Sequence, residues 1–176
     1  MTDQIATATN ALVQVTEVVW KMNHNNGHFI VGLKGTPAYK PFGDWSVLGY
    51  QLDYVTQRVC KRLLDAGGQY VLYPESDYDE EQYQARGEFF SAEKCKFVEG
   101  IPSNCHWNAA VLWKEAEPGK YTIGTGYALS KDGMWRQHSF LVNADGTITE
   151  TTVSRINYFG YRMTDAESES LWEWAV

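Results

Sequence analysis

The sequence predicts an α+β fold, in which a helix packs on an antiparallel β-sheet, and two observations carry this prediction. The hairpin signals KDG (131–133) and ADG (144–146) join three segments of alternating character in the second half of the chain. A helical pattern of apolar residues comes just before them, at 101–115. A chain of 176 residues normally forms one domain and can bury a proper core. We therefore expect a single domain over residues 1–176, with its core at about 100–155 and an N-terminal α/β elaboration.

The composition indicates a globular protein and argues against two classes of binding partner. Hydrophobic residues make up 44% and charged residues 21% of the sequence, which is typical of folded proteins. The net charge of −7 and the lack of a basic stripe argue against nucleic acid or an anionic membrane as the main partner. No apolar run approaches the ~20 residues needed to cross a bilayer, and the first residues lack the features of a signal peptide.

The cysteines indicate the compartment. Cys60, Cys95 and Cys105 are an odd number and show no disulfide-framework spacing. A reducing cytosol fits this usage best, so we expect a cytoplasmic protein with at least one free thiol.

The first half of the chain predicts strands and one clear helix. The helix covers residues 52–68, has an apolar stripe and ends at Gly67 and Gly68. Cys60 lies beside that stripe, so we expect it to serve packing. The other expectations are extended segments at 28–35 and 69–74, an aromatic-rich loop at 36–50 and a solvated acidic segment at 75–88. Residues 11–20 are β-branched and are expected to be extended, with a helix as the alternative.

The stretch IPSNCHWNAAVLWKE, residues 101–115, predicts a helix with a thiol at its start. Ser103 can cap the free amides, and Pro102 stands where no donor is needed. Cys105 then falls in the first turn, where the helix dipole and unpaired amides favour a thiolate. A half-buried packing cysteine is the alternative, because free Cys behaves as a small hydrophobe. His106 is expected to point elsewhere on the helix and to be exposed.

Three strands are expected after this helix, at 121–129, 134–143 and 146–153. If each hairpin has a three-residue loop with glycine in the left-handed position, Ser130 pairs with Met134. In the second hairpin Asn143 then pairs with Thr147. A two-residue loop in the second hairpin would turn Glu150 to the other face, so the position of this carboxylate depends on the three-residue register.

The register brings an imidazole and a carboxylate together. His138 then faces Gly126 across the ladder, and Glu150 becomes its diagonal neighbour on the same sheet face, ~7–8 Å away at the backbone. The small residues Gly124, Gly126 and Ala128 share this face and would let the helix that begins near Cys105 come close.

A thiol, an imidazole and a carboxylate around one point can carry out acyl transfer. A Cys105 thiolate would attack an acyl carbon, and His138 would share its proton and later protonate the leaving group. Glu150 would orient the imidazole. Backbone amides at the helix start could stabilise an oxyanion, with Asn104 as a side-chain donor and Gly126 as a further oxyanion or substrate-binding position.

The tail after the third strand supplies further candidates. Tyr158, Phe159 and Tyr161 are expected to wall the cleft, and MTDAESESLWEW predicts a short helix capped by Thr164.

A cysteine at a helix start, a histidine on a strand and a polar residue on the next strand resemble the papain-like superfamily. Within it, the NlpC/P60-type and transglutaminase-like enzymes are most similar in order and scale, over roughly residues 100–155. The resemblance implies a papain-like core with Cys105 as nucleophile, His138 as base and Glu150 as orienting residue. It also implies a thiol hydrolase or acyltransferase of peptidase or amidase type, acting on an amide, isopeptide or thioester bond with no metal and no cofactor. Its substrate would be a peptide, an isopeptide or a small acyl compound.

Two alternatives stay open. The chain could be a non-catalytic interaction or binding module on the same fold, with FGDW and the C-terminal LWEWAV as contact surfaces. It could also hold a metal through Cys95, Cys105, His106 and His138, although their spacing matches no common zinc pattern.

Overall fold

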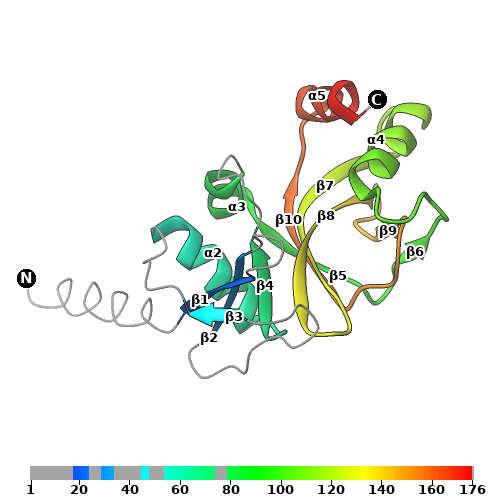
Figure 1. The fold of residues 1–176 in the computed structure, drawn as a ribbon. Coiled ribbons are helices and arrows are strands. Elements are labelled where there is room, and N and C mark those ends of the chain that lie inside the picture. Colours follow the sequence, from blue (N-terminus) through cyan, green and yellow to red (C-terminus); the bar gives the residue numbers. More distant parts are fainter. Residues whose placement is uncertain (1–17, 24–28, 34–44, 48–53, 74–78, 176) are drawn as a thin grey trace, which may run out of the picture. The chain divides into compact units, whose positions relative to one another are not determined.

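A computed structural model describes residues 18–23, 29–33, 45–47, 54–73 and 79–175 of the chain (Figure 1). The chain divides into two compact units, residues 1–84 and 85–176. The single domain expected from the sequence stays a prediction.

The first unit contains a small antiparallel sheet and a helix. Strand β1 (Val18–Asn23) pairs with β2 (Phe29–Leu33) on one side and with β3 (Trp45–Val47) on the other, and β2 also pairs with β4 (Tyr70–Tyr73). The strands expected at 28–35 and 69–74 are confirmed. The loop expected at 36–50 is wrong at β3, because the aromatic and β-branched residues WSV extend the sheet beyond β1. Of the segment 11–20, residues 11–17 lie outside the described ranges and the rest belong to β1.

Helix α2 (Tyr54–Asp65) confirms the amphipathic helix expected from the sequence. Val59, Leu63 and Leu64 are buried, and both glycines that follow have the positive φ angles typical of a helix end. Cys60 is 1% exposed, as its packing role requires.

The described part of the acidic segment contains a helix, α3 (Glu80–Arg86), on which Glu81, Gln84, Ala85 and Arg86 are exposed, as expected of a solvated segment. Tyr83 and Glu80 are buried on this helix, at 1% and 5% exposure.

The second unit is built on an antiparallel sheet with the strand order β8 (Met134–Asn143), β7 (Tyr121–Leu129), β10 (Asn157–Arg162) and β5 (Glu88–Ser91) (Figure 1). The short strand β9 (Ile148–Glu150) pairs antiparallel with the end of β8, and β6 (Lys96–Phe97) runs parallel to β9. The chain therefore has an α+β fold, as its sequence predicts.

The two hairpins have the predicted register. Gly126 lies opposite His138, and the Asn143 amide donates to the Thr147 carbonyl at 2.8 Å. Gly133 and Gly146 take φ angles of 81° and 80°, so each three-residue loop has glycine in the left-handed position. The third strand ends at Glu150 instead of residue 153, because the chain bends there and the next two amides donate to the Glu150 side chain.

Helix α4 (Cys105–Glu115) lies over one face of this sheet. Ala109 of the helix packs on Ile123 of β7 and Leu141 of β8. Leu171 of helix α5 (Asp165–Ala175) joins the same cluster.

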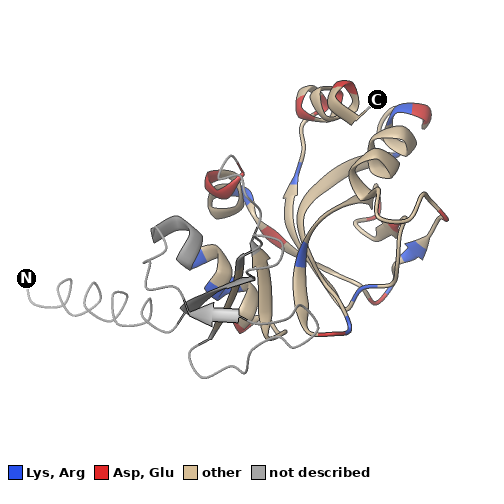
Figure 2. Cartoon of the chain, viewed as in Figure 1, with Lys and Arg blue, Asp and Glu red and all other residues tan. Residues whose placement is uncertain are grey.

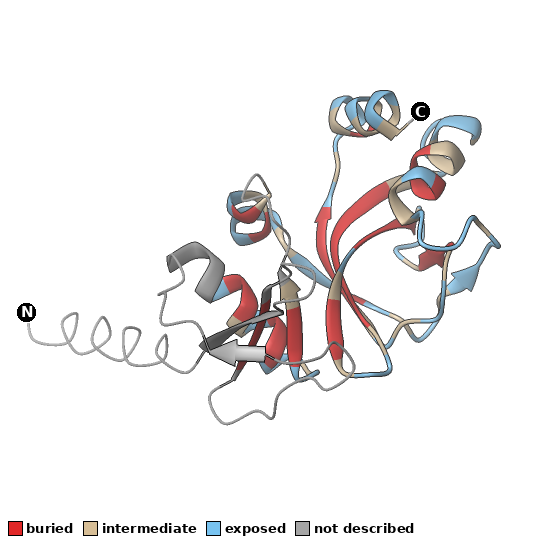
Figure 3. Ribbon diagram, viewed as in Figure 1, coloured by how far each residue is buried: buried red, intermediate tan, exposed pale blue. Residues whose placement is uncertain are grey.

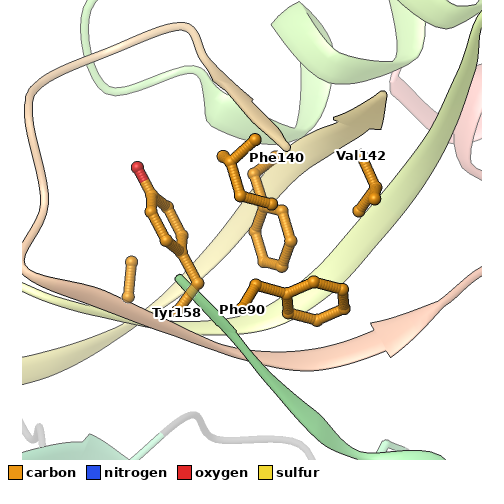
Figure 4. Close-up of a cluster of buried hydrophobic side chains, with 6 residues drawn as sticks. Phe90, Phe140, Val142 and Tyr158 are labelled. Carbon is orange, nitrogen blue, oxygen red and sulfur yellow. The ribbon is translucent and has the colours of Figure 1, made fainter. Parts of the chain in front are cut away.

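The other face of the sheet carries a mainly aromatic cluster. Figure 4 shows the ring of Tyr158 beside that of Phe140, with the hydroxyl oxygen at the end away from Phe90. The ring centroids of Phe140 and Tyr158 are 5.0 Å apart. The central strands are buried along most of their length (Figure 3), and the full cluster comprises Phe90, Ala128, Phe140, Val142, Ile148 and Tyr158.

The small residues of β7 do not make room for α4, contrary to the expectation. A Cβ added at Gly124 would overlap the ring of Phe140, and one at Gly126 would overlap the Phe159 carbonyl. These glycines therefore accommodate a neighbouring ring and the close approach of β10. Helix α4 instead packs on the alternate residues of the strands, which face the other side.

The helix ends are only partly as expected. Asn104 occupies the N-cap position of α4 without a side-chain capping bond, so Ser103 is not the cap. Ser103 instead adopts a φ of 63°, a left-handed conformation two residues before Cys105. The cap of α5 is confirmed, because the Glu167 amide donates to the Thr164 hydroxyl at 3.3 Å and the Glu167 carboxylate accepts from the Thr164 amide. No helix in the described part of the chain is long and apolar enough to cross a membrane.

Candidate active site

The loop before α4 places Cys105 at the first residue of the helix. The Asn108 side chain accepts from the Ile101 amide at 2.9 Å and donates to the Ile101 carbonyl at 2.8 Å. The Gly100 amide donates to the Thr151 carbonyl at 3.0 Å, which ties the same loop to the chain just after β9. Asn108 is only 3% exposed, and sequence reasoning missed it. Its signal was an amide residue inside the otherwise apolar run NAAVLW, where a buried polar side chain needs partners.

His138 and Glu150 form a buried pair. The Nε2 atom of His138 lies 2.9 Å from Oε2 and 3.1 Å from Oε1 of Glu150, and the two residues are 1% and 0% exposed. Because Glu150 takes Nε2, the other ring nitrogen, Nδ1, is left for a further partner. Electrostatic interaction couples this imidazole to the Cys105 thiol. The structure thus brings the three residues together.

Glu150 is surrounded by donors. Its Oε1 accepts from the amides of Thr151 and Thr152, both at 2.8 Å, and from the Thr152 hydroxyl at 2.9 Å. Its Oε2 accepts from the Tyr158 hydroxyl at 2.9 Å. Burial acts to raise the pKa of this carboxyl, but the bonds from His138, Thr152 and Tyr158 outweigh it and lower the pKa from 4.5 to about 2. Glu150 is therefore a fixed negative charge beneath the imidazole.

Tyr158 has a different place from the expected one. It was expected to wall the cleft, but it is fully buried and its hydroxyl binds the carboxylate behind His138. The Cys95 thiol lies 3.6 Å from the same hydroxyl. Burial and the Glu150 charge raise the pKa of Tyr158, and burial raises the pKa of Cys95. Both groups stay protonated at neutral pH and act as donors.

The pKa values at the site favour a charged thiol–imidazole pair. Burial acts to raise the pKa of Cys105, but hydrogen bonds and positive charge from His106 and His138 outweigh it and lower the pKa from 9.0 to about 5. Burial acts to lower the pKa of His138, but its bonds to Cys105 and Glu150 raise it above 6.5. Strand β7 has no charged residue and β8 has only Arg136, so Glu150 supplies the negative charge next to His138 (Figure 2).

His106 is not exposed as expected. It is half-buried, and its Nδ1 lies 2.7 Å from the Ser139 hydroxyl oxygen. The Trp174 ring meets it edge-on with a centroid distance of 6.3 Å. The sequence offered no signal for this, because it depends on α4 lying over the β8 face that carries Ser139.

The two expected oxyanion or substrate positions have different surroundings. Asn104 is exposed, and its side chain makes no capping bond. Gly126 is buried between His138 on β8 and Gly160 on β10. Its missing side chain is explained by the β10 backbone, so any role of Gly126 at a substrate stays a prediction. Within the described ranges, no group of three or more His, Cys, Asp or Glu residues could hold a metal ion.

Comparison with protein-family models, curated proteins and solved structures found no match for this chain.

Proposed function

We propose that the protein is a cysteine hydrolase or acyltransferase that cleaves an amide, isopeptide or thioester bond through Cys105, His138 and Glu150. The observation that supports this most is the buried hydrogen bond between His138 Nε2 and Glu150, at 2.9 Å, beside a thiol at a helix start. This order of groups gives a nucleophile, a base and an orienting carboxylate.

The reaction begins from the thiolate and the imidazolium. The Cys105 sulfur attacks the acyl carbon and forms a C–S bond, and the carbonyl electron pair moves to oxygen. When the tetrahedral adduct collapses, the imidazolium of His138 gives its proton to the leaving nitrogen or sulfur, whose bond to carbon breaks. Water or an acceptor amine then attacks the thioester while His138 takes its proton, and the thiolate leaves. Glu150 stays ionised and holds the imidazole in place.

The start of α4 can stabilise the oxyanion. The first amides of a helix have no acceptor within it, so those of Cys105 and His106 are available to a developing negative charge. The exposed Asn104 amide group stands next to them and supplies a side-chain donor. The positive φ of Ser103 turns the chain just before these amides, and this turn sets the direction in which helix α4 begins.

We further propose a papain-like arrangement for this core, because its nucleophile, base and orienting residue come in the order helix, strand and next strand. A reducing compartment such as the cytoplasm suits it, since the nucleophile must stay a free thiol.

The test is the pH dependence of iodoacetamide labelling at each cysteine, located by mass spectrometry, in the wild type and in His138→Ala. We expect Cys105 to label fastest, with an apparent pKa near 5, and to lose this activation in His138→Ala. Cys95 and Cys60 serve as controls within the same chain, because one has a raised pKa and the other is 1% exposed.

A screen of amide, isopeptide and thioester compounds then looks for acyl transfer that Cys105→Ser abolishes. Slow labelling of Cys105, or labelling indifferent to His138, would refute the proposed site and favour the non-catalytic binding module.

A further inference from the structure

We propose that Tyr158 is a positioning residue of the candidate site, whose hydroxyl fixes the Glu150 carboxylate in the orientation that receives His138 Nε2. The inference deepens the proposed function and rests on it where the reactivity of Cys105 is concerned. Tyr158 comes from β10, whereas the three residues of the proposed triad come from α4, β8 and β9.

The two oxygens of Glu150 differ in where their donors come from. Oε1 accepts from the amides of Thr151 and Thr152 and from the Thr152 hydroxyl, at 2.8 to 2.9 Å. These donors belong to the two residues that follow Glu150, so the bend of its own chain supplies them. Oε2 accepts from His138 Nε2 and from the Tyr158 hydroxyl, both at 2.9 Å. Among the described residues, Tyr158 is thus the only donor besides His138 that bonds to Oε2.

The bond from Tyr158 removes the remaining freedom of the carboxylate. Donors on one oxygen alone leave the other oxygen free to swing about it, whereas donors on both oxygens fix the plane of the group. His138 Nε2 is 2.9 Å from Oε2 and 3.1 Å from Oε1, so a rotation that moves Oε2 would lengthen the shorter of these bonds. Tyr158 therefore holds the oxygen that lies nearer to the imidazole.

The Tyr158 hydroxyl is itself held in place. The ring is fully buried, with its centroid 5.0 Å from that of Phe140 (Figure 4) and 6.3 Å from that of His138. The backbone of Tyr158 is paired on both sides, with Ala128 of β7 and with Phe90 of β5. Two strand pairings and packed rings therefore keep the hydroxyl at Oε2.

The hydroxyl proton is available to Glu150. An ionised carboxylate only accepts hydrogen bonds, so the single proton of the Tyr158 hydroxyl is donated to Oε2. The Cys95 sulfur lies 3.6 Å from the same hydroxyl. Burial raises the pKa of the Cys95 thiol, so no thiolate competes with Glu150 for this proton.

This arrangement bears on the imidazole. With its Nε2–H held by Glu150, neutral His138 has its lone pair on Nδ1, the nitrogen that can exchange a proton with a reacting group. A carboxylate that is free to turn would let the ring turn with it and would no longer select one tautomer. Loss of the Tyr158 hydroxyl should therefore reduce reactivity at the site, although Tyr158 acts only through Glu150.

The experiment compares Tyr158→Phe with Thr152→Val, since each removes one hydroxyl donor from Glu150 with little change in side-chain shape. One readout is the proton NMR resonance of His138 Nε2–H, assigned by its loss in His138→Ala. The other is the iodoacetamide labelling rate of Cys105 at neutral pH. We expect Tyr158→Phe to broaden the resonance and to slow Cys105 by about tenfold, the effect of one charge-assisted hydrogen bond. Thr152→Val should change both by less, because two amides still hold Oε1.

The control variant is Tyr121→Phe, which removes a phenolic hydroxyl from β7 outside the site and should match the wild type in both readouts. Effects of Tyr158→Phe no larger than those of Thr152→Val would overturn the positioning role. If Tyr158→Phe does not fold, the wild type decides. Its Tyr158 hydroxyl proton should be visible by NMR and exchange slowly with water, and a rapidly exchanging hydroxyl would count against the proposal.

The two readouts separate this proposal from the proposed function. If the Cys105 rate falls in His138→Ala, and Tyr158→Phe leaves both the rate and the resonance unchanged, the role of Tyr158 is overturned and the triad stands. A Cys105 rate that is indifferent to His138→Ala refutes the proposed function. The resonance in Tyr158→Phe then decides by itself whether Tyr158 positions the pair of His138 and Glu150.

Discussion

At the scale of single residues, Glu150 determines the charge state of the candidate site. Its two oxygens accept from a ring nitrogen, two backbone amides and two hydroxyls, and the side chain is fully buried. A carboxylate with so many donors stays ionised and supports a positive imidazole. The thiolate form of Cys105 depends on that imidazole, so a substitution at Glu150 should also change the reactivity of the Cys105 thiol.

Replacing Glu150 by Gln tests this dependence, because the amide keeps the size and removes the charge. We expect labelling of Cys105 at mildly acidic pH to fall at least about tenfold, since the imidazolium loses its partner. Acyl transfer on any substrate found should fall by about a hundredfold or more. Glu99→Gln, which changes an exposed acid before α4, is the matched control. Equal labelling rates in the two variants would show that Glu150 does not act on the thiol.

At the scale of elements, two strand pairings on either side of β7 set the position of His138. The β7–β8 hairpin places it opposite Gly126, and β10 approaches Gly126 from the other side. Gly126 faces Gly160 across that pairing, and a Cβ on either glycine would overlap the opposing backbone. The position of β10, and with it the hydrogen bond from Tyr158 to Glu150, therefore depends on this close approach.

The variant Gly126→Ala should be strongly destabilised. Its Cβ would overlap the Phe159 carbonyl and come within 2.5 Å of the Gly160 Cα, so β10 would have to move. We expect a loss of at least about 2 kcal/mol in the free energy of unfolding, in the range of overpacked sites. The control is Gly146→Ala, where φ is 80° and nothing lies within 4 Å of the added Cβ, so only the backbone strain of about 1 kcal/mol remains. Denaturant unfolding compares the two, and similar losses would contradict the steric argument.

At the scale of the whole molecule, the site links folding to pH. The Glu150 pKa is lowered from 4.5 to about 2, so its stabilising contribution is complete above pH 4.5 and is lost as pH falls from there towards 2. The lowering of the Glu150 pKa corresponds to about 3 kcal/mol in the free energy of unfolding. His138 acts in the opposite sense, because its raised pKa contributes stability that is lost only as pH rises through the folded value.

Acid unfolding should therefore depend in part on the Glu150 carboxylate. We expect the free energy of unfolding of the wild type to fall more steeply between pH 4.5 and 2 than that of Glu150→Gln. Denaturant titrations at a series of pH values measure the two slopes. Glu88→Gln, which removes an exposed partner of Arg162, should keep the wild-type slope. Parallel slopes for the wild type and Glu150→Gln would mean that Glu150 is not ionised in the folded protein as described.

Much of the second unit was predictable from local sequence signals. The glycines of KDG and ADG require the left-handed conformation, and a three-residue loop then leaves only one pairing of the flanking strands. That pairing makes His138 and Glu150 diagonal neighbours without reference to any tertiary contact. The position of Cys105 in the first turn of a helix followed from the apolar period in the same way.

Other features required the tertiary structure, because they depend on residues far apart in sequence. Tyr158 reaches Glu150 only because β10 adds to β7, and Asn108 holds the loop only because α4 turns back towards residue 101. His106 meets Ser139 because α4 covers the face of β8 opposite to His138. A period of two or 3.6 residues assigns a side chain to a face but does not say what covers that face. The sequence by itself thus determined helices α2 and α4 and the register of the two hairpins, and tertiary packing decided which further donors surround the Glu150 carboxylate.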